Sequence, residues 1–392
     1  MRYAAASPRR CADFRSLRSA QIPSKKADVS EGEFDLPVWR WPDSAGAARA
    51  YALQCELEQR LHGRPSVFLD VNFWIDCRDA RLDPGGHRDK TELYSLLVRA
   101  VREKQLVCPI SSDVLTELTK QQDEDFAATM AVVDELTQRV ALVPHRERLI
   151  IEVERFLGAI APPLAAPHRP IWTSFVYAFG YQDILPPIPS RRTPEDLLAM
   201  VETGWWMRPS AHLPALRRAV TNAKAESERA AARLNRGADD HRAEVTSYAS
   251  VLADELAGAA DLLSGHLLSE YSRMASEAGA PSGDEALRRN LTQMAALGMR
   301  NPEGRKAFGN IVVPATLHAA FRAEKNRRFK PNDVFDFRHA AAALPNCDAF
   351  FTEGKLSRLL ASGHVALTKA YPCRVASTPI EALETLRSLG IE

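Results

Sequence analysis

The sequence feature that most constrains the fold is an apolar run that ends in an acidic residue. Gly63 and Pro65 end a helical pattern, and the chain then reads Ser66-Val-Phe-Leu-Asp70. A short apolar run rich in β-formers and bounded by Gly and Pro predicts a buried strand, here over 67–69. An acid directly after such a strand is costly to place near a core unless it has partners or a metal ion. The fold must therefore bring compensating groups to Asp70.

Helical and extended patterns alternate on both sides of a long central stretch. Ser111, Ser112 or Asp113 can cap a further helix that carries Glu117. The other expected elements are helices over 47–61, 90–104, 333–344 and 355–361, and extended segments over 105–110, 349–352 and 364–367. Alternation of this kind predicts an α/β fold with a parallel sheet.

The central stretch differs in composition from the two blocks that flank it. Residues 160–215 are rich in proline and aromatic residues, including Trp172, Trp205 and Trp206, and long charged helical text follows over 213–278. We expect a mostly helical insertion whose tryptophans pack in a core, with a base-stacking platform as the alternative. The expected organisation is a basic, poorly ordered N-terminal segment over 1–45, an α/β domain in two parts over 46–150 and 321–392, and the insertion over 151–320.

Composition excludes several classes of protein. The chain has 392 residues, 45% of them hydrophobic, and its 51 Lys and Arg against 50 Asp and Glu give a net charge of +1. It can bury a large core, and any nucleic-acid partner must be recognised locally. The six cysteines are scattered singly, which argues against a disulfide scaffold or a zinc ribbon. No stretch approaches the roughly 18 consecutive apolar residues of a membrane span, so we expect no membrane partner and a cytoplasmic location.

Acidic residues recur at positions where a metal ion could be held. Asp70 and Glu353 each follow a predicted strand, Glu117 lies in a helix, and Asp333 and Asp336 open another helix. Carboxylates bind hard cations such as Mg²⁺ and Mn²⁺, and the carboxyl ends of parallel strands form the functional edge of an α/β sheet. Each acid also has a simpler explanation, because Asp near a helix N-terminus gains about 0.3–1 kcal/mol from the helix dipole alone.

Three blocks of the chain resemble the PIN-domain nucleases, in that family's order. They are Val67-Phe-Leu-Asp70-Val-Asn72, Ile110-Ser-Ser112 with Glu117 following, and Asp336-Phe-Arg-His-Ala-Ala-Ala-Ala343 followed by Phe350-Phe-Thr352-Glu353. The resemblance implies a central parallel sheet sandwiched by helices. It also implies that Asp70, Glu117, Asp336 and Glu353 bind Mg²⁺ or Mn²⁺, with Asp333 nearby, and direct hydrolysis of RNA phosphodiester bonds. Asn72, Ser112 and Thr352 would be supporting polar groups.

Two features depart from the family pattern. Glu353 stands where the family usually has Asp, and Asp348, at the start of the same predicted strand, is the alternative fourth acid. The long insertion between Glu117 and Asp336 is absent from compact members of the family, including its small toxins. An endoribonuclease acting in defence, in RNA processing or as a toxin remains the leading hypothesis.

A basic segment directly precedes the helix of Asp333. It contains five cations and a single acid, Glu324; the cations are Arg322, Lys325, Arg327, Arg328 and Lys330. Phosphate contacts from such a segment would bind RNA, or single-stranded DNA, without reading bases. The alternative is a solvated helix end. The sequence leaves open an antitoxin or other protein partner and a homodimer.

Two other functions compete with a nuclease. The first is a catalytically inactive PIN-like module that binds nucleic acid or protein, which the retained acids argue against. The second is a haloacid dehalogenase type phosphatase, which expects a second Asp two residues after the first, where this chain has Asn72. His339, three residues after Asp336, is expected in the core and is given no primary role.

Overall fold

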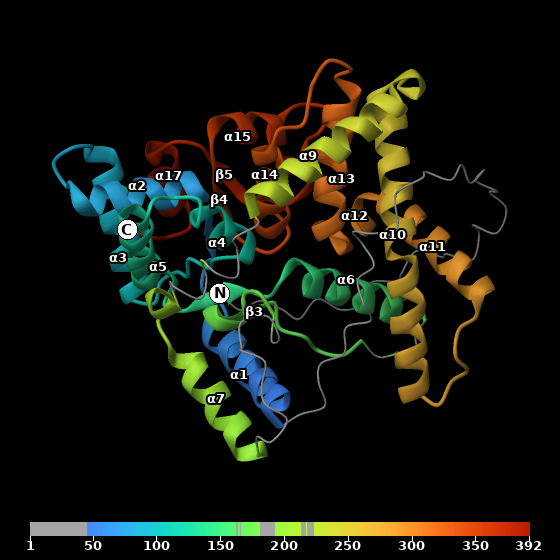
Figure 1. Cartoon of the computed structure of the whole chain (residues 1–392), viewed down its shortest axis with the longest axis horizontal. Helices are drawn as coiled ribbons and strands as arrows, with labels where there is room; N and C mark the ends of the chain where they lie inside the picture. Colours follow the sequence, from blue (N-terminus) through green and yellow to red (C-terminus); the bar gives the residue numbers. More distant parts are fainter. Residues whose placement is uncertain (1–44, 162–163, 165, 181–192, 213–216, 218–222) are drawn as a thin grey trace. The chain divides into compact units, whose positions relative to one another are not determined.

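The computed structural model shown in Figure 1 describes residues 45–161, 164, 166–180, 193–212, 217 and 223–392. The basic N-terminal segment expected over 1–45 lies outside the described residues, apart from Ala45, which begins helix α1 (Ala45–Leu61). Part of the proline-rich stretch, including 181–192, also lies outside them.

A parallel sheet of three strands joins the two blocks of the sequence. Strand β1 (Val67–Leu69) pairs with β4 (Ala349–Phe351), which pairs with β5 (Arg374–Ala376), and both pairings are parallel. All residues of β1 and β4 are buried, as is typical of apolar strands covered on both faces. The parallel sheet expected from the sequence is present, although helices make up most of the described chain.

The third strand is not the one that the sequence predicted. The run 364–367 was expected to form it, but Ala366 adopts a left-handed conformation with φ of 47° and leads into the short helix α16 (Leu367–Ala370). Strand β5 lies further on, with an exposed first residue and no apolar run. A short apolar run does not distinguish a strand from a buried helical turn, and an edge strand needs no such run. The segment 105–110 likewise forms only isolated parallel bridges, Ser66 with Val107 and Ile110 with Ala141.

Helices from both blocks surround the sheet in a first hydrophobic core. They are α2 (Val71–Leu82), α3 (Arg88–Arg102), α4 (Ser112–Leu118), α5 (Asp123–Thr137), α14 (Pro331–Ala343), α15 (Gly354–Ala361) and α17 (Pro379–Ser388). Helix α14 follows the basic segment and lies beside β4 (Figure 1). Ser111 caps α4 by accepting a hydrogen bond from the backbone N of Val114 at 3.3 Å, as one of the three expected caps.

The stretch between the two blocks is mostly helical and builds a second core. Its strand β3 (Trp172–Ser174) pairs antiparallel with β2 (Val140–Leu142) of the first block. Its helices are α6 (His145–Ile160), η2 (Phe175–Tyr177), α7 (Pro194–Trp206), η3 (Pro209–His212), α9 (Ala223–Asp240), η4 (Arg242–Glu244), α10 (Tyr248–Glu277), α11 (Glu285–Arg300), α12 (Pro302–Ala307) and α13 (Gly309–Ala323). Apolar residues of α6, α10, α11 and α13 form the second core.

Helix α13 belongs to both cores. Val313 and Leu317 pack in the first core, whereas Val312 and Ala315 pack in the second. The boundaries expected at 150/151 and 320/321 fall inside α6 and α13. The insertion is therefore continuous with the α/β part through shared helices.

The tryptophans of the insertion occupy different environments. Trp205 is 3% exposed in a third apolar cluster with Val176 and Tyr177, and Trp172 packs against that cluster. Trp206 is 48% exposed and lies beside the guanidinium groups of Arg60 and Arg139. The core role expected for these residues thus holds for Trp205 and Trp172 and is wrong for Trp206.

A helix can cross a bilayer only if about 20 consecutive residues are predominantly apolar. The longest described helix is α10, which has 30 residues and carries charged residues near its start, middle and end. Within the described ranges, no helix is long and apolar enough to cross a membrane.

Candidate functional site

Asp70 is held at the carboxyl end of β1 by four protein donors. One oxygen, Oδ1, accepts hydrogen bonds from the backbone N of Asn72 at 3.0 Å and of Phe73 at 3.4 Å, which caps helix α2. The other, Oδ2, accepts hydrogen bonds from the hydroxyl of Thr352 and from the backbone N of Glu353 at 3.1 Å. The side chain is 4% exposed, and its burial raises the pKa to about 6 against the lowering effect of these bonds. Asp70 is therefore fixed between the ends of β1 and β4.

The charges of Asp70 and Glu353 act on two acids in helices, Glu117 in α4 and Asp336 in α14. Burial is the largest cause that raises the pKa of Glu117 to about 7, and the charges of Asp70 and Glu353 raise it further, whereas Lys120 lowers it. Burial likewise raises the pKa of Asp336 to about 8, together with the charges of Glu353, Glu117, Asp70 and Asp333. Carboxylates shift each other in this way only when they are close in a medium that screens poorly. The four acids predicted from separate blocks thus converge at one edge of the sheet.

Asp333 has structural partners for both of its oxygens. The backbone N of Lys330 donates a hydrogen bond to Oδ2 at 2.7 Å, which caps helix α14, and the ammonium of Lys355 lies 2.9 Å from Oδ1. The side chain is 3% exposed. The capping role that the sequence left open therefore accounts for Asp333, although its charge still acts on Asp336.

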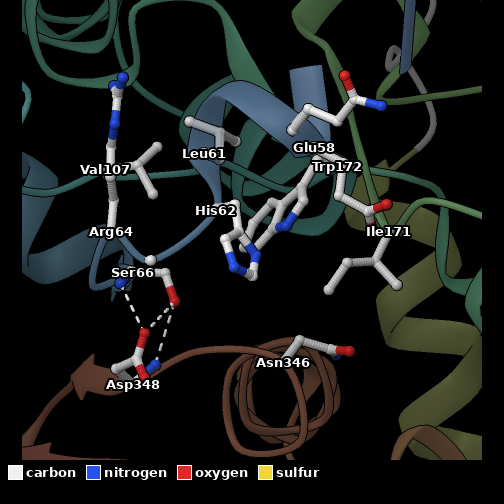
Figure 2. Close-up of a pocket in the computed structure, with 12 residues that line it drawn as sticks. Glu58, Leu61, His62, Arg64, Ser66, Val107, Ile171, Trp172, Asn346 and Asp348 are labelled. Carbon is white, nitrogen blue, oxygen red and sulfur yellow. Dashed lines mark hydrogen bonds between the residues drawn. The ribbon is translucent and has the colours of Figure 1, made fainter. Parts of the chain in front are cut away.

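Asp348 lies at the opposite end of β4 from the four acids Asp70, Glu117, Asp336 and Glu353, which we call the acidic cluster. Its Oδ2 accepts hydrogen bonds from the backbone N and the hydroxyl of Ser66, both at 2.8 Å, at the start of β1 (Figure 2). Of the two candidates for the fourth acid, Glu353 is the one that acts on Asp336 and Glu117. Asp348 instead ties together the amino ends of two strands.

A pocket of about 600 Å³ opens at this amino end of the sheet. Figure 2 shows His62 and Trp172 beside each other, with Asn346 and Asp348 on the opposite wall. None of the residues predicted to be catalytic lines it. The pocket and the acidic cluster are thus separate features at opposite ends of the same strands.

The donor chemistry of the acidic cluster fits a hard cation, but the side chains do not form a closed cage. Among the described residues, no three His, Cys, Asp or Glu side chains are grouped closely enough to hold a metal ion. Mg²⁺ keeps several of its waters and is usually bound by one or two carboxylates together with substrate phosphates. The cluster therefore suits an ion held partly through water, and it does not resemble a preformed site of the zinc type.

Three cations near the acids were missed by the sequence analysis. The ammonium of Lys120 lies 3.6 Å from Glu117 and 4.0 Å from the centre of the Phe335 ring. Lys355 pairs with Asp333, and the half-exposed Arg338 lies 3.5 Å from Asp113. Each cation is two or three residues after one of the matched acids, so sequence proximity could have identified them.

Most of the predicted basic segment is neutralised locally. Arg322 pairs with Glu255, Arg327 with Glu324 at 3.0 Å, and Arg328 with Asp239 at 2.6 Å; Arg327 also lies 3.5 Å from the centre of the Phe321 ring. The remaining two cations, Lys325 and Lys330, are exposed. The segment keeps its position beside α14 but presents fewer free cations than its sequence suggests.

The predicted supporting residues have different roles. Thr352 contacts Asp70 directly, whereas Asn72 contacts it through the backbone N. Ser112 is the first residue of α4, and the neighbouring Ser111 provides the cap.

Comparison of the chain with family models, with curated proteins and with solved structures finds no match.

Proposed function

We propose that this protein is a metal-dependent endoribonuclease of the PIN type. The observation that carries the proposal is the proximity of four acids at the carboxyl ends of parallel strands: the charges of Asp70 and Glu353 raise the pKa of Glu117, and the charges of all three raise the pKa of Asp336. Sites where ionisable groups are shifted by burial and by specific neighbours are candidates for function. The resemblance of the three sequence blocks supports the choice of reaction.

A divalent cation would compensate the charge of this cluster. Asp336, Glu353 and Glu117 are the acids best suited to hold Mg²⁺ or Mn²⁺, because Asp70 already receives four hydrogen bonds. When bound, the ion would lower the pKa of a coordinated water and withdraw charge from the scissile phosphate.

The chain's own residues have defined parts in this proposal. Asp70 fixes the edge of the site, because Thr352 and Glu353 hold it against β4. Lys120 and Lys355 lie beside the acids and would contact the phosphates of the substrate. Lys325 and Lys330 would extend this phosphate contact toward RNA, or toward single-stranded DNA, without reading bases.

The experiment is a cleavage assay with matched variants at the two ends of β4. Purified protein is incubated with end-labelled single-stranded RNA and with DNA of the same sequence, in Mg²⁺, Mn²⁺ or EDTA. We expect RNA cleavage that depends on metal and falls by more than about 100-fold in Asp336→Asn. Asp348→Asn is the control, because it removes an acid from the opposite end of the strand. Equal activity of Asp336→Asn and the wild type would refute the proposal.

A catalytically inactive module is the second candidate. It is favoured by the finding that no three acids of the described chain are close enough to ligate one ion. A folded wild type that binds RNA, shows no cleavage with either metal and binds no Mn²⁺ would establish this alternative. Binding of Mn²⁺ with a stoichiometry lost in Asp336→Asn would argue against it.

A further inference from the structure

His339 is a buried residue whose free ring nitrogen faces the acidic cluster. Its side chain is 2% exposed, and Nε2 lies 3.8 Å from Oε2 of Glu117. Nε2 is fully buried, and no group in the described part of the chain forms a hydrogen bond with it. An unsatisfied buried polar atom costs about 1–3 kcal/mol, so it calls for an explanation.

The orientation of the ring is fixed on its other sides. The rings of Phe68 and Phe335 lie 6.4 and 6.5 Å from the imidazole, centre to centre. A hydrogen bond to the backbone of Asp113 engages the ring as well, and since Nε2 is without a partner this bond belongs to Nδ1. A bond to a backbone carbonyl makes Nδ1 the donor, which leaves Nε2 of the neutral ring as an acceptor.

We propose that His339 is a positioning residue for Glu117 and holds its carboxylate in the acidic site through a shared water. A separation of 3.8 Å is too long for a direct hydrogen bond, but one water can donate to Nε2 and to Oε2 at the same time. This arrangement would fix Oε2 on the His339 side and leave Oε1 beside Lys120. The inference rests on the proposed function and adds a residue that orients one of its acids.

His145 supplies a comparison within the same group of buried polar side chains. Its Nδ1 is also buried and has no hydrogen-bond partner among the residues that the structure describes, and the charges of Asp113 and Arg148 act on its ring. It begins helix α6, and the charges that act on it are those of Arg148, Asp113 and Arg338. Replacement of His145 therefore disturbs the packing and hydration of this group without removing the acceptor that faces Glu117.

Two replacements of His339 separate the contact made by Nε2 from the hydrogen bond made by Nδ1. Gln at position 339 places a polar group near the site of Nε2, whereas Asn places one near the site of Nδ1. His339→Asn can keep the bond to Asp113 but loses contact with Glu117, and His339→Gln does the reverse. Mn²⁺ binding is measured by the electron paramagnetic resonance signal of the free ion, and cleavage of RNA is measured in parallel.

We expect His339→Asn to weaken Mn²⁺ binding by about 10- to 100-fold, as is typical when a partner of a ligating residue is lost. His339→Gln and His145→Gln should stay within about threefold of the wild type, with unfolding midpoints lowered by similar amounts in all three variants. Equal Mn²⁺ affinity of His339→Asn and His339→Gln would overturn the assignment, because a purely structural residue gives that result.

A second measurement uses the wild-type protein, so its result does not depend on whether a variant folds. In wild-type protein labelled with ¹⁵N in its histidines, Mg²⁺ should shift the nitrogen resonances of one buried neutral imidazole, because its water-mediated partner becomes a metal-binding group. Resonances of buried imidazoles that do not change with Mg²⁺ would overturn the role of His339. A wild type that neither binds Mn²⁺ nor cleaves RNA would instead refute the proposed function itself, and the inference with it.

Discussion

The hydroxyl of Thr352 donates a hydrogen bond to Oδ2 of Asp70, although 282 positions separate the two residues in the sequence. The bond joins the carboxyl ends of β1 and β4, and the backbone N of Glu353 donates to the same oxygen. The first acid of the cluster is therefore oriented by residues that follow the insertion. The acidic cluster can form only when both blocks of the chain are folded together.

Thr352→Val tests this connection. The variant preserves the shape of a fully buried side chain but removes one of the four donors to Asp70. We expect the free energy of unfolding to fall by about 1–3 kcal/mol, because a buried carboxylate loses a partner. Thr352→Ser keeps the hydroxyl, so its free energy of unfolding should fall by less than that of Thr352→Val. Urea unfolding at neutral pH measures both, and a smaller loss in the Val variant than in the Ser variant would contradict the role of the bond.

The raised pKa of Asp336 predicts how stability changes with pH in metal-free protein. Its pKa is about 8 in the folded chain, against an ordinary value of 3.8. Ionisation is therefore less favourable in the folded state, and the stability that the neutral carboxyl contributes is complete below pH 3.8 and is lost as pH rises to about 8. Asp336→Asn removes this dependence.

We accordingly expect metal-free Asp336→Asn to be more stable than the wild type at pH 9, by more than about 2 kcal/mol, with the difference disappearing near pH 4. Chemical unfolding of both proteins in EDTA across this range measures the effect. Added Mg²⁺ should reduce the difference at pH 9, because the ion stabilises the ionised cluster of the wild type. A variant that is less stable than the wild type at pH 9 would contradict the repulsion among these acids.

A buried polar group joins helices α6 and α13. Asn310 of α13 accepts a hydrogen bond from Nε of Arg148 at 2.8 Å and donates from its backbone N and its Nδ2 to Glu152, at 2.9 and 2.8 Å. Arg148 is 1% exposed. Asn310→Ala would leave a buried guanidinium with fewer partners, and we expect a loss of about 3 kcal/mol.

Asn235 provides the comparison for Asn310. Its amide bonds with the backbone N and O of Phe329, both at 2.9 Å, in a partly buried position without a charged partner. Asn235→Ala should cost about 1 kcal/mol. Thermal and urea unfolding of the two variants measure the difference, and equal losses would mean that Arg148 is satisfied without Asn310.

The sequence predicted those parts of the molecule that depend on local patterns. The apolar run before Asp70, the cap at Ser111 and the helix carrying Asp336 all lie where periodicity and boundary residues indicate. Asp70 and Glu353 follow parallel strands whose carboxyl ends are aligned, and their charges act on Glu117 and Asp336; the metal-binding role of these acids stays a prediction.

The parts that could not be predicted depend on partners far away in the sequence. Strand β5 is defined by its pairing with β4 and not by its own pattern. The acidic partners of Arg322 and Arg328 lie 67 and 89 positions away in the sequence. The local sequence therefore indicates two free cations, whereas both form ion pairs in the fold. His339 looked like an ordinary core residue because its distance from Glu117 depends on how α4 and α14 pack.

The basic segment contains arginines held in ion pairs, of which Arg328 is exposed, and two exposed lysines. Lys325 and Lys330 are exposed, whereas Arg322, Arg327 and Arg328 are held in ion pairs with acids. Each Lys that neutralises a phosphate adds about one to the salt slope of binding. Replacing both Lys residues with Ala should therefore weaken RNA binding and reduce the slope by about two.

Replacing Arg327 and Arg328 is the matched comparison, since it removes the same formal charge from the same segment. These two Arg residues must break existing ion pairs before they can contact a phosphate, so their loss should change the slope by less than one. Fluorescence anisotropy of labelled RNA across a series of salt concentrations measures both variants. If the Arg pair changed the slope more than the Lys pair, the ion pairs would have to open on binding, and the phosphate contacts would lie on the arginine side of the segment.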